Sequence, residues 1–211
     1  IICMNNARNP PDAACTAYSE GNYGGDDMAE SNLTKNALAS ALKQLMTELP
    51  FSKITIADIC EQCQMNRKSF YYHFKDKYDL LNWIFDNEII AVLQHVPGDS
   101  TLELLEAICD YLYQNRSFYC AALETTGQNS FSEHFRDFLL PLVAEHLRAT
   151  YSIPNIRQFQ INFFTDGLVC SLERWIQQKD CIPPHELMEG LHACVVAIAH
   201  SVTDSDTFSS T

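Results

Sequence analysis

The chain has 211 residues, 46% of them hydrophobic, which is enough to bury a substantial core as one moderate domain or two small ones. Its apolar runs are shorter than the roughly 18 residues that cross a bilayer, and its N-terminus lacks the basic and apolar regions of a secretory signal. These features argue against a membrane or secreted protein, and we expect a cytoplasmic one with no membrane partner.

Charge is distributed unevenly along the chain. The net charge of −13 argues against nucleic-acid binding, because attraction to phosphates dominates such affinities. Between Ser31 and Lys77, however, seven Lys or Arg residues stand against four Asp or Glu, a net of +3, which leaves −16 for the rest. This predicts a basic DNA-reading segment on an acidic body that itself avoids DNA.

Nine cysteines occur without regular spacing, which favours a reducing compartment over a disulfide framework. Cys60 and Cys63 form a CxxC pair, but no second CxxC or HxxxH follows to complete a zinc site. Both lie on the apolar stripe of an expected helix, so we interpret them as small buried residues. GxSxG, HExxH, Walker-loop and GxGxxG motifs are also absent. The sequence thus predicts no catalytic residue, no metal site and no cofactor, which argues against an enzyme.

In chain order, residues 1–30 mix Asn, Pro, Gly, Asp and Ala without an apolar period, so we expect a disordered N-terminal extension. Met28 stands just before the first helical pattern, and our hypothesis is that the native chain starts there. Apolar residues then recur every three or four positions from Leu33 to Leu49, where Pro50 ends the first long helix.

Two short helices joined by a tight turn come next, and the rest of the chain is organised around them. Thr55 and Asp58 have capping-box spacing and begin the first of these helices. The turn is expected at Gln64 and Met65, and Asn66 is a suitable N-cap for the second helix. This arrangement predicts a helix-turn-helix, which places its second helix in the major groove of DNA.

The second short helix is expected to run from Arg67 to Phe74. Phe70 and Phe74, four residues apart, should face inward. The outward residues carry donors and cations suited to phosphate oxygens and base edges, namely Arg67, Lys68, Ser69, Tyr71, Tyr72 and His73. An aromatic-rich amphipathic helix is more often part of a core, but the cap, the turn and the flanking cations together favour DNA binding.

The remaining pattern is helical throughout, so the fold class is all-α. Helices are expected over 76–94, 101–115, 117–126, 131–151, 154–179 and 184–202, with Pro141 kinking or splitting the fourth of them. One side of the helix from Pro154 is expected to carry Phe159, Phe163, Leu168, Leu172 and Trp175.

These elements suggest a division of the chain. Residues 31–77 would form the helix-turn-helix DNA-binding domain, and residues 78–203 a helical regulatory and dimerisation domain. Residues 204–211 are polar and are expected to be a disordered tail.

Many positions between Thr34 and Leu80 agree with one family signature at fixed spacing. They are Thr34, Ala41, Phe51, Ile54-Thr55-Ile56, Asp58-Ile59, Phe70-Tyr71-Tyr72-His73-Phe74, Lys77 and Leu80. On these residues the chain resembles the TetR family of transcriptional regulators. One departure is Gln64, where the family usually has Gly; a left-handed backbone there would cost Gln roughly 1 kcal/mol.

The resemblance implies how the chain would meet DNA. Phosphate contacts are implied for Thr55, Ser69, Tyr71, His73 and Lys77, and base contacts for Arg67, Lys68 and Tyr72. It also implies a homodimer that pairs through the last two long helices and binds an inverted-repeat double-stranded operator.

The body is similar to one TetR subgroup, the dihydroxyacetone-kinase operon regulators. The similarity rests on Asn115-Arg116, Phe118-Tyr119, Ala122-Leu123 and residues 127–131. That subgroup implies an activator that responds to a protein partner, whereas most of the family are repressors released by small molecules, so both kinds of effector stay open.

The effector pocket cannot be assigned from the sequence. Residues that could line one are Tyr111, Tyr119, His134, Asn162 and Asp166. The alternative to an effector-controlled operator-binding dimer is a partner-dependent activator, or a helical interaction module without its own operator.

Overall fold

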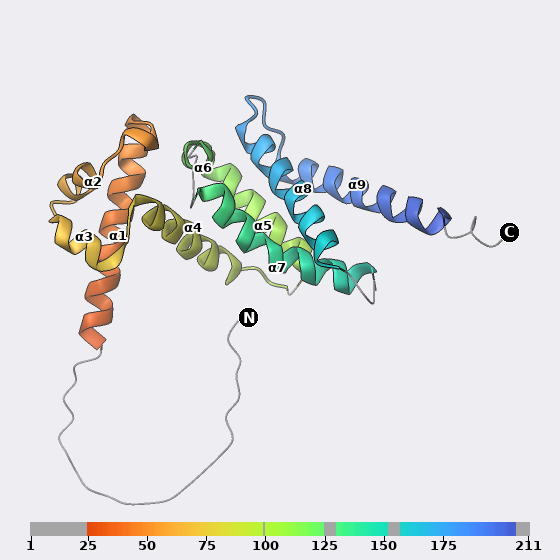
Figure 1. Ribbon diagram of the computed structural model, residues 1–211, viewed down its shortest axis with the longest axis horizontal. Coiled ribbons are helices and arrows are strands. Elements are labelled where there is room, and N and C mark those ends of the chain that lie inside the picture. The colour runs from red at the N-terminus through yellow and green to blue at the C-terminus, as the bar shows by residue number, and fades with distance from the viewer. Residues whose placement is uncertain (1–24, 99, 125–129, 152–156, 206–211) are drawn as a thin grey trace, which may run out of the picture.

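The computed structural model describes residues 25–98, 100–124, 130–151 and 157–205 (Figure 1). Over these ranges the chain forms nine α-helices and one short 3-10 helix, which confirms the all-α prediction. The elements are α1 (Gly25–Glu48), η1 (Phe51–Lys53), α2 (Ile56–Gln62), α3 (Arg67–His73), α4 (Lys77–Leu93), α5 (Thr101–Gln114), α6 (Arg116–Leu123), α7 (Phe131–Tyr151), α8 (Gln158–Gln177) and α9 (Pro184–Ser205).

Helix α1 starts earlier than the sequence pattern indicated. It begins at Gly25, so the segment predicted to be disordered is helical from there on, and residues 1–24 lie outside the described residues. The added residues include Met28, Ala29 and Glu30, which favour helix by intrinsic propensity although they extend no apolar stripe. Apolar periodicity therefore placed the start too late.

Helices α1, α2 and α3 form a small unit, which we call the reader. Leu38 and Leu42 of α1, Ile59 of α2 and Phe70 of α3 have no exposed surface, so one apolar centre holds the three helices together. Figure 1 shows α2 and α3 crossing the same side of α1. The apolar stripes predicted for these helices are confirmed, except that Leu33 and Leu49, at the two ends of the first stripe, are exposed.

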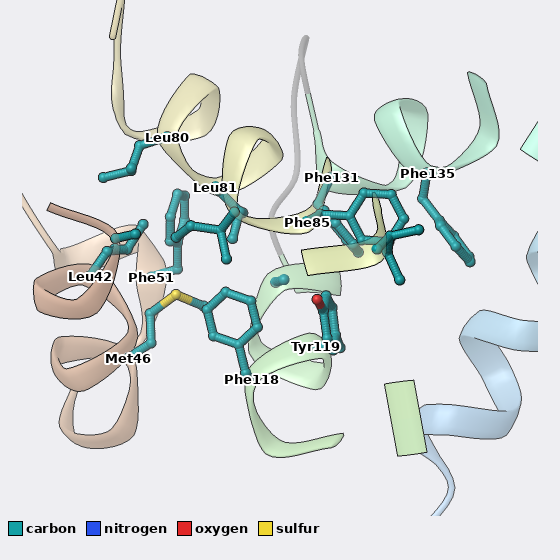
Figure 2. Close-up of a cluster of buried hydrophobic side chains, with 14 of the residues drawn as sticks. Leu42, Met46, Phe51, Leu80, Leu81, Phe85, Phe118, Tyr119, Phe131 and Phe135 are labelled. Atoms are coloured by element: carbon teal, nitrogen blue, oxygen red, sulfur yellow. The ribbon is translucent and has the colours of Figure 1, made fainter. Parts of the chain in front are cut away.

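Helix α4 joins the reader to the remaining helices, α5–α9, which we call the body. Its Leu80, Leu81, Ile84, Phe85 and Ile89 are all buried. Figure 2 shows Leu81 and Phe85 of α4 between side chains of the reader and side chains of α6 and α7. The boundary predicted after Lys77 therefore falls at the first residue of a helix whose core is shared by both parts.

Phe85 lies at the centre of the aromatic core beneath α4. Its ring makes edge contacts with Tyr119 of α6 and with Phe131, Phe135 and Phe138 of α7, at centroid distances of 5.2 to 6.2 Å. Such contacts add about 0.5–1.5 kcal/mol per pair beyond the area that the rings bury. The part of the body nearest the reader is therefore filled by aromatic side chains.

The long helices α7 and α8 pack side by side in the body (Figure 1). Pro141 lies within a continuous α7, so it does not split the helix as one reading of the sequence allowed. Helix α8 begins at Gln158 instead of the predicted Pro154, because the Gln160 side chain accepts the Arg157 N–H at 2.8 Å and caps the helix there. Residues 152–156 lie outside the described ranges.

The stripe predicted for α8 is wrong in part. Leu172 and Trp175 are buried, but Phe159 is 77% exposed and Phe163 is 60% exposed. Phe163 and Leu172 are nine positions apart, which at 3.6 residues per turn puts them on opposite sides of the helix. The two phenylalanines therefore lie on a separate, outward face.

The last helix, α9, continues to Ser205, slightly beyond its predicted end, and residues 206–211 lie outside the described part of the chain. Among the described residues, no helix is both long and apolar enough to cross a membrane.

Candidate nucleic-acid interface

Local side-chain caps fix both helices of the predicted helix-turn-helix. The Thr55 hydroxyl accepts the Asp58 N–H at 3.3 Å, and Asp58 Oδ2 accepts the Thr55 N–H at 2.8 Å, so the capping box is confirmed. Asn66 Oδ1 accepts the Ser69 N–H at 2.8 Å and caps α3 as predicted. Each cap contributes about 0.5–2 kcal/mol and fixes where its helix begins.

The turn between α2 and α3 contains a left-handed residue. Gln64 has φ of 56°, the only positive φ among the described non-glycine residues. Its position confirms the sequence prediction, and its conformation is the one in which glycine is more favourable. The turn is held in place by the Met65 N–H, which donates to Cys60 O at 2.8 Å.

The inner side of α3 is anchored by aromatic side chains. Phe70 has no exposed surface and Phe74 is 3% exposed, as the sequence predicted. The Phe74 ring also meets the Trp83 ring of α4 edge-on at 5.7 Å. Because α3 is only seven residues long, this anchoring determines which of its side chains face outward.

The outer side of α3 presents cations and aromatic side chains to solvent. Arg67 and Lys68 are exposed, and Tyr71 and Tyr72 are 58% and 78% exposed. His73 is half-buried with its ring 4.8 Å from that of Tyr72. Burial, aided by the charge of Lys35, lowers the pKa of His73, which favours a neutral imidazole at this surface.

Two side chains predicted to contact phosphates already make hydrogen bonds within the protein. The Thr55 hydroxyl donates to Asp58 Oδ2 at 2.8 Å, and the Ser69 hydroxyl donates to Asn66 Oδ1 at 3.2 Å. Each lies next to the exposed surface of α3, but each would have to redirect its proton to reach a phosphate oxygen. Their DNA contacts stay predictions.

Lys77, which was predicted to contact a phosphate, already has three hydrogen-bond partners in the protein. Its ammonium donates to Phe51 O and Ile54 O, both at 2.7 Å, and to Ser52 O at 3.3 Å. An ammonium has three N–H groups, so these three carbonyls use its full donor capacity. Burial lowers the Lys77 pKa, partly offset by Asp58, and the charge also lies 4.6 Å above the Phe51 ring. Lys77 thus fastens η1 to the start of α4 and is not available for a phosphate in this arrangement.

Two cations that the sequence reasoning did not single out lie near the same surface. Lys75 is exposed directly after α3, and Lys35 of α1 lies with Nζ 5.9 Å from the Trp83 ring centroid and near His73. Both entered the charge count for this segment. Nothing in the local pattern separated them from other surface lysines.

The residues proposed for an effector pocket do not come together. Tyr111 and Tyr119 pack with centroids 6.1 Å apart, and the Tyr119 hydroxyl donates to Glu88 Oε2 at 3.3 Å. Burial raises the pKa of both tyrosines, so both are neutral. The other Glu88 oxygen meets Lys43 Nζ at 2.5 Å, which links this group to α1.

The other three pocket candidates have separate partners. His134 Nε2 lies 2.7 Å from Asp86 Oδ1, Asn162 accepts from Gln158 at 3.0 Å, and Asp166 accepts from Arg136 at 2.6 Å. These contacts do not join the five residues in one cavity, and the effector pocket stays unassigned.

The CxxC pair lies within α2 and at its end. Cys60 is 3% exposed and Cys63 is half-buried, and burial raises the pKa of both thiols. A raised pKa disfavours the thiolate that binds metal, which agrees with their interpretation as apolar residues. No group of three or more potential metal ligands occurs among the described residues.

Two family models match the chain. The model described as "Bacterial regulatory proteins, tetR family" matches residues 38–84, and the one described as "Transcriptional regulator C-terminal region" matches residues 99–195. Together they span most of the reader, the first part of α4 and most of the body.

Individual relatives agree with these matches. The chain is 30% identical over 97 residues to the HTH-type dhaKLM operon transcriptional activator DhaS of Lactococcus lactis subsp. lactis (strain IL1403), covering 44% of this chain and 50% of that protein. It thus spans about half the length of this curated relative.

Two solved structures share the fold. A dihydroxyacetone kinase operon activator DhaS has a TM-score of 0.59 at 19% identity, over 80% of this chain and 97% of that one. A TetR transcriptional regulator from Streptococcus agalactiae 2603V has a TM-score of 0.63 at 22% identity, over 81% and 97% of the two chains.

Proposed function

Because the chain belongs to the TetR family of transcriptional regulators, we propose that it is a regulator that binds operator DNA through α3. The observation that carries this proposal is the division of α3 into two sides. Phe70 and Phe74 are buried, while Arg67, Lys68 and Tyr72 face solvent. A helix held rigidly in this way can present the same donors to successive base pairs in the major groove.

The contacts with DNA divide into two kinds in this proposal. Arg67, Lys68 and Tyr72 read base edges, because they are exposed near the start of α3 or at its outermost position. Phosphate contacts come from Tyr71, His73, Thr55 and Ser69, the last two after their hydroxyl protons turn outward. Lys77 has no DNA contact in this scheme.

A homodimer is part of the same proposal. The outward face of α8 carries Phe159 and Phe163, and burying both against a second copy would remove a large apolar area from water. A twofold pair of readers about 34–36 Å apart would meet successive major grooves of an inverted repeat. Such a regulator would act in the cytoplasm, where the operator is.

Control by an effector completes the proposal. An effector bound to the body can change DNA affinity only if its own affinity differs between two arrangements of the readers. Helix α4 is the element through which the body would act, because both parts share its buried side chains. Dihydroxyacetone-kinase genes are the first targets to test, given the name of the sequence relative.

The experiment is selection of bound sequences from a random duplex pool with the full chain. We expect enrichment of an inverted repeat, and its position in the source genome would identify the regulated genes. A reporter fused to that site would distinguish activation from repression. If the folded protein enriches no sequence, the reader does not recognise an operator alone, and a partner-dependent activator or an interaction module takes its place.

A further inference from the structure

A separate apolar cleft lies in the body, away from the aromatic core around Phe85. Helices α5, α7, α8 and α9 form it, and it has a volume of about 290 Å³. Leu105, Leu142, Leu168 and Leu191 supply part of its apolar wall. Phe163, Gly167 and His192 also line it and are exposed, so the cleft is open to solvent on that side. An apolar cleft of this size is a candidate binding site.

The lining of the cleft contrasts with the rest of the chain. The protein has 27 acidic residues, yet none of the described residues that line the cleft is Asp, Glu, Lys or Arg. An apolar space without charges excludes a ligand whose charged group would lie deep among the leucines, because that group would lose its water without compensation. The occupant must therefore be mainly hydrocarbon.

Two histidines and a threonine are among the residues that line this cleft. His146 of α7 and His192 of α9 both line it, and they lie close enough for the charge of His192 to act on His146. Burial and His192 lower the pKa of His146, so neutral imidazole is favoured there. A neutral imidazole offers one N–H donor, and Thr101 adds a hydroxyl at the start of α5.

We propose that the cleft binds an amphipathic carboxylate of medium chain length, with its hydrocarbon chain among the leucines and its carboxylate near His146 and His192. A water molecule fills about 30 Å³ in the liquid, and a methylene group is of similar size, so the cleft holds about eight to ten carbons. The claim that this ligand is the effector rests on the proposed function. The claim that the cleft binds it does not.

Two glycines give a matched pair of variants. A Cβ atom added to Gly167, which lines the cleft, or to Gly190 of α9, which does not, would have no neighbouring atom within 4 Å. Leucine at either position also favours helix more than glycine does, so both variants should fold. Gly167→Leu places its side chain in the cleft, while Gly190→Leu adds the same group elsewhere.

The test is calorimetric titration of the full chain with decanoate, hexanoate and decanol, all below their micelle concentrations. Decanoate should bind more tightly than hexanoate by about fourfold for each buried methylene. Gly167→Leu should weaken decanoate binding by tenfold or more, and Gly190→Leu should leave it unchanged. His192→Leu should weaken decanoate by about tenfold but spare decanol, because only the charged hydrogen bond is lost.

Three results would overturn the inference. These are no decanoate binding by the folded protein, equal affinity for hexanoate and decanoate, or equal decanoate affinity in both glycine variants. A change of oligomeric mass in Gly167→Leu, without loss of decanoate binding, would assign the cleft to contact with a second copy. Operator selection is measured separately, so failure here with an enriched operator leaves the proposed function intact. If decanoate binds but no operator is enriched, the cleft is still a binding site and the proposed function fails.

Discussion

Lys77→Met separates the structural role of this lysine from the phosphate contact that the family resemblance implies. Methionine keeps most of the aliphatic length over the Phe51 ring but removes the ammonium that binds three carbonyl oxygens. Hydrogen bonds to a charged group contribute about 1.5–3 kcal/mol, and the lost cation–π contact adds about 0.5–1 kcal/mol. Water can reach the exposed side of η1 and replace part of the lost hydrogen bonding. We therefore expect the free energy of unfolding to fall by about 2 kcal/mol, near the lower end of these ranges.

Urea unfolding followed by circular dichroism measures this loss as a lower midpoint with an unchanged slope. Exposed Lys68 provides the control: Lys68→Met should leave the midpoint unchanged. In DNA titrations at several salt concentrations, Lys77→Met should leave the salt slope unchanged. The reasoning is refuted if Lys77→Met unfolds like the unmodified protein and lowers the slope by about one.

Four further changes test the interface and the pairing. Gln64→Gly should raise the free energy of unfolding by up to about 1 kcal/mol, because its φ of 56° suits glycine; urea unfolding measures the gain. Hydrogen bonds from Thr55 lower the pKa of Asp58 below 3.8, so the capping box stabilises the reader above that pH and is lost as the pH falls through the lower value. Asp58→Asn should accordingly flatten the acid end of a stability–pH curve. Arg67→Ala should cost about 1–3 kcal/mol and relax preference at about one base pair in binding-site selection. Phe163→Glu should shift the protein toward monomer in sedimentation equilibrium, because a carboxylate would be buried at the proposed α8 contact.

Each of these four predictions has an outcome that would contradict it. No gain from Gln64→Gly would mean that the turn relaxes without strain, and an unaltered acid limb in Asp58→Asn would place the acid sensitivity in other carboxylates. Equal losses on specific and random DNA for Arg67→Ala would exclude it as a base reader. An unchanged dimer in Phe163→Glu would move the pairing surface away from this face of α8.

The parts of the interface that follow from near neighbours could be predicted from the sequence. The caps at Thr55 and Asn66 and the inward turn of Phe70 each depend on residues within four positions along the chain. The left-handed Gln64 was found by comparison with a family glycine, which is also local information. Short-range hydrogen bonds and helical periodicity are sufficient for these features.

Features that depend on distant segments were not predictable in this way. The carbonyls that hold Lys77 come from residues 23 to 26 positions earlier, so nothing beside Lys77 indicates that its charge is already used. On α8, the spacing of apolar residues could not show that Phe159 and Phe163 face away from Leu172, because both faces carry large apolar side chains. Tertiary packing decides which of two such faces becomes the core.

Glu88 has a consequence for exchanging parts between related proteins. One carboxylate on α4 meets Lys43 of α1 and the hydroxyl of Tyr119 of α6. A chimera that joins this reader to a foreign body after α4 would keep Lys43 and Glu88 but lose the tyrosine, and one joined before α4 would lose Glu88. In either case a partly buried charge loses a partner, so new operator specificities are better made by substitutions on the outer side of α3 than by exchanging whole domains.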